Sequence, residues 1–297
     1  MVEVLVVSSP SSARRVLGTL RKFRRLPLIP SFIILLVIFT GIFANLIAPH
    51  SPRVGILSER LTPPAWSSEG STNHLLGTDQ QGRDILSRII HGARVSILVS
   101  AVTLLIGGTV GVTLGLLAGW YGGWIDEIIM RMVDILLALP LILVALVLVV
   151  SLGQSLSVIL VVLAIWIWPR FARMIRGEVL RLRTMDYIAL AQVSGASTFR
   201  IITVHLFPGV INTLIIVATL QVGIVILVES TLSFLGAGVP PPTPAWGSMV
   251  AEGRDKLALA WWISTLPGVA IMLTVMALNL FGDWLRDTLD PRLRQLE

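Results

Sequence analysis

The chain has 297 residues, of which 55% are hydrophobic and 13% charged, and its mean hydropathy is +0.86. So little polar surface excludes a soluble globular protein, and the lack of cysteine excludes disulfides and thiolate chemistry. The net charge of +6 does not call for a nucleic-acid partner, because a basic excess on one side of a membrane gives the same total.

Apolar runs recur along the chain, and each has the length of about 20 residues that a helix needs to cross the hydrocarbon core of a bilayer. No water is present there to satisfy the backbone, so helices are favoured, and the alternation of a transmembrane barrel does not occur. We therefore predict an all-α membrane protein with six transmembrane helices and both termini in the cytoplasm. The predicted spans are residues 28–48, 95–119, 125–150, 156–172, 209–232 and 261–282.

The start of the chain is polar and basic, and the apolar run after it could also be interpreted as a signal peptide. That run is long, however, and Ala48 is followed by Pro49, a poor cleavage site, so we expect a retained anchor. The predicted division is a cytoplasmic tail at 1–27, a first helix at 28–48, an extracytoplasmic loop at 49–94, a five-helix core at 95–283 with a cytoplasmic loop at 173–208, and a cytoplasmic tail at 284–297.

The distribution of basic residues supports this topology. Sixteen of the 23 Lys and Arg residues fall on the predicted cytoplasmic side and seven on the outer side. The positive-inside rule therefore favours six spans with both termini inside.

Two spans carry residues that predict their packing. The second contains five glycines between positions 107 and 119, at spacings that let helices approach closely, so it should lie inside the bundle. The third contains Pro140, which should kink the helix.

The segment from Asp186 to Pro208 is partly polar, is interrupted by glycine and lies between long apolar runs on the predicted cytoplasmic side. It is too long for an ordinary connection between helices, which has only a few residues. We expect two short helices separated at Gly195, where glycine can adopt the left-handed conformation of a helix C-cap. Ser197 is placed to cap the second helix.

The second short helix is predicted to be amphipathic. Phe199, Ile202 and Leu206 fall on one face by their spacing of three and four residues, and Pro208 should end the helix before the next span. From the pattern alone, this hairpin could rest on the bilayer surface or insert into a cleft of a cytoplasmic partner protein.

The residues DYIALAQVSGAS, followed by HLFP, resemble the EAA loop of permease subunits of bacterial ABC importers. In that family, a glycine followed at a fixed distance by a Leu/Phe-Pro pair marks the coupling helix that docks into the ATPase subunit, and Gly195 and Pro208 match. Ala189 stands where the family has glutamate, so docking would depend on shape and apolar contact. The resemblance implies an ATPase-coupling loop that contains Asp186, Tyr187, Ala189, Ala191, Gly195, Ala196, Ser197, His205 and Pro208.

Three further segments are similar to the dipeptide, oligopeptide and nickel branch of these permeases. With the EAA-like loop, they extend from residue 74 to the end of the chain. They are HLLGTDQQGRDILSRIIHGARVS (74–96), FLGAGVPPPTPAWGSMVAEGRD (234–255) and PGVAIMLTVMALNLFGDWLRDTLDPRLR (267–294).

The resemblance implies the type I ABC importer permease fold and a subunit that forms half of the translocation path for short peptides or a related small solute. It also implies a homologous second permease (another chain or a second copy), two cytoplasmic ABC ATPase subunits and an extracytoplasmic solute-binding protein. The setting would be the inner membrane of a bacterial or archaeal cell. Relatives of similar sequence handle peptides, nickel, sugars or glutathione-like solutes, so the substrate within this range stays open.

Two groups of polar residues outside the loop are candidates for function. Asp79, Arg83 and Asp84 could form an ion-pair network on the outer face, which either fixes the outer loop to the bundle or meets a substrate-delivery protein. Glu229 is the single acid in an apolar span, so it should face the bundle interior or a wet cavity. It could line the translocation path with Ser233, or it could be bonded to Ser230, to Ser233 or to another helix as a structural group.

Enzyme chemistry has little support in the sequence. No phosphate-binding loop occurs, so ATP hydrolysis is expected on separate subunits, and no catalytic residue, cofactor or metal is predicted. The histidines at 50, 74, 91 and 205 lack a ligand spacing and are not expected to converge. A secondary transporter driven by an ion gradient is the main alternative, and it would need inverted repeats and paired charges within the membrane. A membrane-embedded enzyme would need a catalytic dyad at matched depth.

Overall fold

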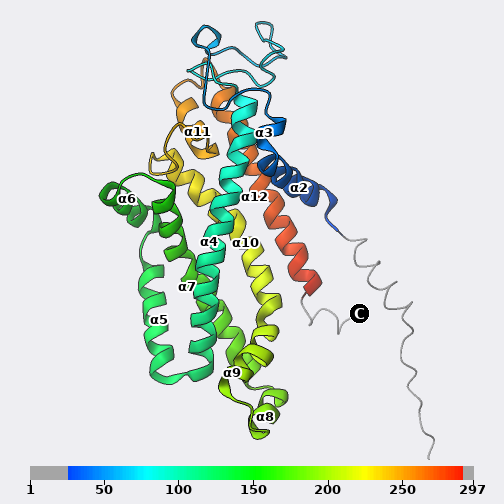
Figure 1. Cartoon of the computed structure of the whole chain (residues 1–297), viewed down its shortest axis with the longest axis vertical. Helices are drawn as coiled ribbons and strands as arrows, with labels where there is room; N and C mark the ends of the chain where they lie inside the picture. Colours follow the sequence, from blue (N-terminus) through cyan, green and yellow to red (C-terminus); the bar gives the residue numbers. More distant parts are fainter. Residues whose placement is uncertain (1–25, 290–297) are drawn as a thin grey trace, which may run out of the picture.

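The structure, a computed structural model, describes residues 26–289, and within this range the regular elements are helices apart from one isolated bridge between Thr78 and Asp84 (Figure 1). Residues 1–25 of the predicted tail at 1–27, and residues 290–297 of the tail at 284–297, lie outside the described residues. The helices are α2 (Leu28–Ile42), α3 (Ala44–Ile47), η1 (Leu57–Glu59), α4 (Ile85–Tyr121), α5 (Gly123–Ala138), α6 (Leu141–Leu152), α7 (Leu156–Arg183), α8 (Asp186–Val193), α9 (Thr198–Arg200), η2 (Ile201–Leu206), α10 (Phe207–Phe234), α11 (Trp246–Arg254) and α12 (Trp262–Leu289).

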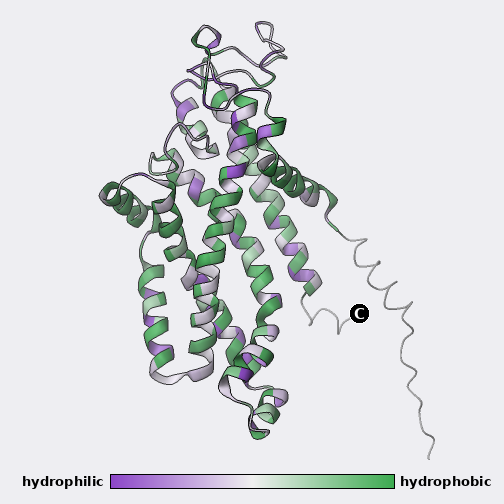
Figure 2. Cartoon of the chain, viewed as in Figure 1, coloured by the Kyte–Doolittle hydropathy of each residue, from purple (hydrophilic) through white to green (hydrophobic). Residues whose placement is uncertain are grey.

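Long helices run side by side along the longest axis of the molecule (Figure 1). One end, called here the α11 end, carries α11 and the loop over residues 49–84. The opposite end, called the α8 end, carries α8 and α9. Apolar residues cover most of the length between the two ends, as Figure 2 shows.

Four helices are long and apolar enough to cross a membrane, namely α4, α7, α12 and the continuous helix Thr198–Phe234. The pair α5 and α6 passes the same test together, which gives up to five spans. α2 is apolar, but its 15 residues rise only about 22 Å, less than the hydrocarbon thickness of about 30 Å.

The predicted third span differs most from the structure. α5 and α6 are bent by 86° relative to each other, so residues 125–150 form a broken pair of helices instead of one kinked helix. Leu139 is extended, as expected for a residue before proline, and Pro140 stands at the N-cap of α6. α6 therefore leaves the direction of α5 altogether.

Two loops are shorter than predicted because their flanking helices extend into them. α4 begins at Ile85, not at residue 95, since the Asp84 carboxylate caps it by accepting from the Ser87 N–H at 2.8 Å. α7 continues to Arg183, and the Arg176 guanidinium bonds the Asp126 carboxylate of α5 at 2.5 Å. The cap at Asp84 and the ion pair between α7 and α5 thus stabilise helical turns beyond the apolar runs.

The glycines of α4 form its contact with α7, as the sequence predicted. A Cβ at Gly115 would lie 2.7 Å from the Ala172 carbonyl oxygen, and one at Gly119 would lie 2.7 Å from the Val179 Cβ. Since the neighbouring atoms belong to the backbone or to a branched Cβ, they cannot move aside. The two helices are therefore in contact through their backbones.

Replacing Gly115 by alanine should lower the free energy of unfolding by about 1–3 kcal/mol, because the added methyl group overpacks the α4–α7 contact. The matched control is Gly177→Ala on α7, where an added Cβ meets nothing within 4 Å. That change should be neutral or stabilising by up to about 1 kcal/mol. Thermal unfolding of both variants in detergent measures the difference, and equal midpoints would contradict the close contact.

Candidate functional site

α8 ends in a glycine cap that the sequence predicted. Gly195 has φ +76°, its N–H bonds to the Gln192 carbonyl at 3.0 Å, and the Ala196 N–H bonds to the Ala191 carbonyl at 3.0 Å. This pair of bonds is the Schellman motif, which satisfies carbonyls left free at a helix end. The chain therefore turns sharply at Gly195.

The helix after this turn begins as predicted but does not end as predicted. Ser197 caps it, since its Oγ accepts from the Arg200 N–H at 3.4 Å. Pro208 does not end it, because α9, η2 and α10 form one helix from Thr198 to Phe234. η2 is a π-helix in which the Phe207 N–H bonds to the Ile202 carbonyl, and this wider turn carries the helix past the missing proline N–H.

The apolar residues here do not share one face as predicted. Phe199 is 78% exposed, whereas Leu206 is fully buried and Ile202 packs partly into the core. The π-helical turn changes the angular spacing, so the predicted stripe is divided between the core and the surface.

Three large apolar side chains at the α8 end are left uncovered, and we call them the apolar tip. They are Leu190, Val193 and Phe199, with exposed fractions of 66%, 88% and 78%. Their neighbour Ile188 is fully buried and anchors α8. Large apolar side chains left exposed around a turn are typical of a binding surface.

The other residues of the predicted coupling loop take different positions around this tip. Tyr187 and His205 lie together, with ring centroids 6.4 Å apart. Asp186, Tyr187, Ala189, Gly195, Ser197 and Pro208 are exposed, while Ala191, Ala196 and His205 are half-buried.

At the α11 end, a buried ion cluster joins the loop, α4 and α11. Arg83 Nε lies 2.6 Å from Asp79 Oδ2, and Arg83 Nη2 lies 2.8 Å from Glu252 Oε2. Arg88 bonds to the same Asp79 oxygen and lies 2.7 Å from Glu252 Oε2. The two carboxylates neutralise the charge of the two arginines, because a buried charge is costly unless it is paired. The sequence predicted the Asp79–Arg83 pair but missed Arg88 and Glu252, because 164 residues separate those two.

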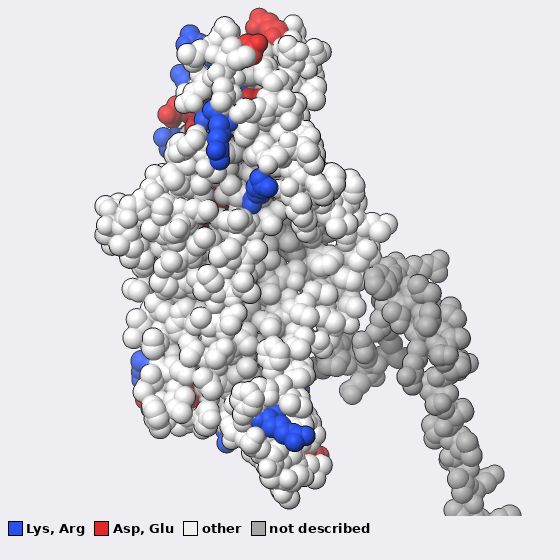
Figure 3. Space-filling model, viewed as in Figure 1, with Lys and Arg blue, Asp and Glu red and all other residues white. Residues whose placement is uncertain are grey.

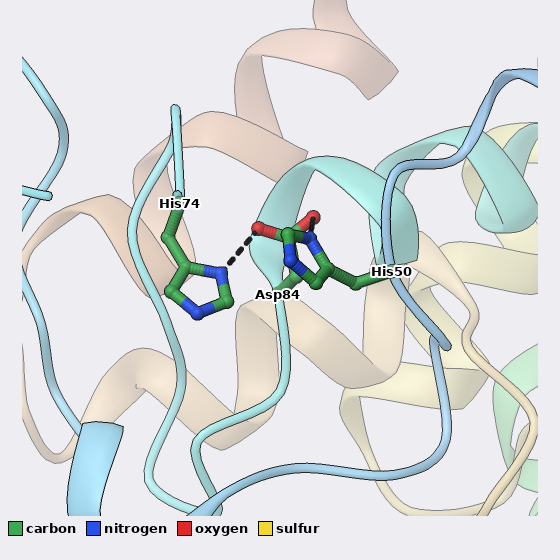
Figure 4. A group of neighbouring side chains, drawn as sticks. All are labelled: His50, His74 and Asp84. Atoms are coloured by element: carbon green, nitrogen blue, oxygen red, sulfur yellow. Dashed lines mark hydrogen bonds and ion pairs between the residues drawn. The ribbon is translucent and has the colours of Figure 1, made fainter. Parts of the chain in front are cut away.

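Asp84 does not join Asp79 and Arg83 as predicted, because its carboxylate belongs to a different group of side chains. Its Oδ2 accepts from the Ser87 N–H and hydroxyl at 2.8 and 2.7 Å, and its Oδ1 lies 2.9 Å from His74 Nδ1. His50 Nδ1 is 3.9 Å from the same carboxylate. The four histidines are not expected from the sequence to converge as one site, but two of them do meet: Figure 4 shows the rings of His50 and His74 beside Asp84.

The other ring nitrogen of His74, Nε2, lies 3.1 Å from Glu59 Oε2. Burial lowers the pKa of His74, but hydrogen bonds to Asp84 and Glu59 and the charges of both acids outweigh it, so this pKa is raised above 6.5. Sequence spacing could not show this group, because its members are distant positions of one long loop that meet only when the loop folds.

Glu229 is fully buried in α10, within the chain itself. The Ser233 hydroxyl donates to its Oε1 at 2.7 Å and accepts from the Val239 N–H at 3.3 Å. Of the two interpretations left open by the sequence, this geometry matches the structural one. A groove of about 630 Å³ between α10 and α12 is lined instead by apolar residues that include Leu227, Ile271 and Met272.

Comparison with known proteins gives concordant matches. Residues 111–295 match the family described as binding-protein-dependent transport system inner membrane component. The chain is 46% identical over 262 residues to the dipeptide transport system permease protein of Escherichia coli K12, which covers 88% of this chain and 87% of that protein. It is 43% identical over 260 residues to the di/tripeptide transport system permease protein of Pseudomonas aeruginosa, covering 88% and 86%. The dipeptide permease protein of Haemophilus influenzae is 40% identical over 274 residues, covering 92% and 93%.

Proposed function

Because this chain belongs to the family of binding-protein-dependent transport system inner membrane components, we propose that it forms half of the path by which an ATP-binding-cassette importer carries short peptides across a bacterial inner membrane. The substrate follows from its relatives, whose names specify dipeptides and tripeptides. A second, homologous permease would complete the path, two separate ATPase subunits would hydrolyse ATP, and a solute-binding protein would deliver the peptide.

We propose six spans with both termini in the cytoplasm. α2 with α3, the α5–α6 pair and the four long helices supply the six segments. The α8 end would be cytoplasmic and the α11 end extracytoplasmic. Figure 3 supports a membrane between them, because charged residues gather toward the two ends and the face between them is mostly uncharged.

The apolar tip is the surface that we propose docks into an ATPase subunit. Leu190, Val193 and Phe199 expose apolar area that contact with a partner would bury. Ala189 offers no charge at the family's glutamate position, so docking here would depend on apolar contact and on the shape of the Gly195 turn. The Schellman bonds keep that shape rigid.

Movement of the tip would reach the membrane through one helix. The helix Thr198–Phe234 has 37 residues and a length of about 55 Å, so a displacement of its end by ATPase closure would tilt α10 as a body. The groove between α10 and α12 lies along this helix, and we propose that it faces the translocation path and the second permease. Tilting α10 would then open the groove first to one face of the membrane and then to the other.

The double variant Leu190→Ser with Phe199→Ser should lose ATPase binding. Burial of each side chain is worth about 1.5–3 kcal/mol, so losing both weakens association by well over tenfold. Leu257→Ser with Leu259→Ser, at exposed positions of the α11 end, is the matched control. Co-purification of the ATPase subunits is the measurement, and full retention by the tip variant would contradict docking at this surface.

Gly195→Val should reduce ATP-driven peptide uptake by about tenfold without affecting membrane insertion, because the left-handed conformation costs a non-glycine residue about 1–2 kcal/mol and more when it is β-branched. Gly195→Asn is the control, since asparagine tolerates this conformation and a Cβ here meets nothing within 4 Å. Uptake by the assembled importer in vesicles separates the two. Wild-type uptake by the valine variant would contradict a role for the turn.

A further inference from the structure

Two histidines and an aspartate meet at the α11 end in an arrangement that transport does not explain. His50 follows α3, His74 lies in the loop over 49–84, and Asp84 caps α4. One ligand atom from each lies within 4.8 Å of the others. Among residues 26–289, these are the histidine and carboxylate side chains whose ligand atoms come close enough to hold a metal ion together. Figure 4 shows the two imidazole rings close to the carboxylate, with His74 bonded to one of its oxygens.

The distances between the ligand atoms of these side chains are close to those in an occupied metal site. In a tetrahedral site with bonds of about 2.1 Å, neighbouring ligand atoms lie about 3.4 Å apart. His74 Nδ1 is 2.9 Å from Asp84 Oδ1 and His50 Nδ1 is 3.9 Å from Asp84 Oδ2, and these two distances lie on either side of that value. One ligand atom from each of the three side chains lies within 4.8 Å of the others, so side-chain rotations would bring the three atoms around one ion.

The side chains that commonly support metal ligands are also present. A histidine that binds a metal through one nitrogen almost always uses the other to bond a carboxylate or carbonyl. Here His74 presents Nδ1 to the site, and its Nε2 lies 3.1 Å from Glu59 Oε2. Ser87 holds Asp84 Oδ2 through its N–H and hydroxyl, and the same hydroxyl accepts from the His50 N–H at 3.0 Å.

A cluster held by hydrogen bonds alone would account for His74 but not for His50. The His50 Nδ1 lies too far from Asp84, at 3.9 Å, for a hydrogen bond. Its ring nevertheless lies beside that of His74, with centroids 4.7 Å apart. An ion between the nitrogens and the carboxylate would give the His50 ring a protein-held partner in place of the water that its 40% exposure admits.

We propose that His50, His74 and Asp84 bind one divalent transition-metal ion of the zinc type, with water as the fourth ligand. Two imidazole nitrogens and one carboxylate oxygen suit zinc, cobalt or nickel better than calcium or magnesium, which prefer oxygen. The His50 side chain is 40% exposed, so water reaches the site, whereas His74 and Asp84 are buried. Binding displaces the proton on His74 Nδ1 to solvent.

The ion would connect three separate segments at the α11 end. It would fix the end of the first apolar helix and the long loop to the first turn of α4. Its role is therefore to hold the shape of the outer loop, next to the buried ion cluster of Asp79, Arg83, Arg88 and Glu252.

The test uses the full chain in detergent, purified through a tag without histidine and stripped with a chelator. Calorimetric titration with zinc chloride should show saturable binding of about one ion per chain. Cobalt chloride should give the visible absorption bands of a tetrahedral complex. His50→Ala should weaken zinc binding at least tenfold and remove those bands, and Glu59→Gln should weaken it by about tenfold through the orientation of His74.

His91→Gln is the control, because His91 bonds the Ser87 carbonyl and lies near Asn45 outside the three ligands, so its zinc affinity should equal that of the wild type. His50→Ala leaves the hydrogen bonds of His74 intact, so it separates metal binding from structural hydrogen bonding. The proposal is overturned by absence of saturable zinc binding in the wild type, or by wild-type affinity in His50→Ala.

Discussion

The continuity of one helix across Pro208 is the constraint on which the rest of this structure depends. A proline in mid-helix normally breaks the chain of backbone bonds, and the π-helical turn of η2 avoids that break. At its far end, Ser233 bonds both Glu229 and the Val239 N–H, which fixes the next turn. Phe199 of the apolar tip and the far end of the bundle therefore belong to one continuous helix, and the Gly195 turn joins Leu190 and Val193 to it.

The remaining contacts fall into two groups: the close packing of α4 against α7, and the contacts of α11 at the α11 end. α4 and α7 meet at backbone distance through the glycines of α4. α11 then joins α10 to α4, since Trp246 donates to the Ile89 carbonyl at 2.9 Å and Glu252 bonds the arginines of the first turns of α4 and the preceding loop. A tilt of α10 is thus opposed by these contacts at its far end, while its near end carries exposed Phe199 as well as the buried side chains Leu206 and Val210.

Local features could be predicted from the sequence, and features made by distant residues could not. The apolar runs predicted the helices, and the cap at Ser197 and the turn at Gly195 depend only on neighbouring residues. The prediction that Pro208 ends the helix was wrong, because the general rule that proline breaks a helix does not anticipate a π-helical turn just before it. The pairing of Arg88 with Glu252 and the meeting of His50 with His74 require the folded chain, since no spacing in the sequence indicates them.

The central claim is that this chain moves peptides only when separate ATPase subunits act on its α8 end. Its most direct measurement is uptake of a labelled dipeptide into vesicles that contain both permeases and the loaded binding protein, with and without the ATPase subunits. The account predicts uptake only when both the ATPase subunits and ATP are present. Uptake driven by a proton or sodium gradient in vesicles that lack the ATPase would contradict it.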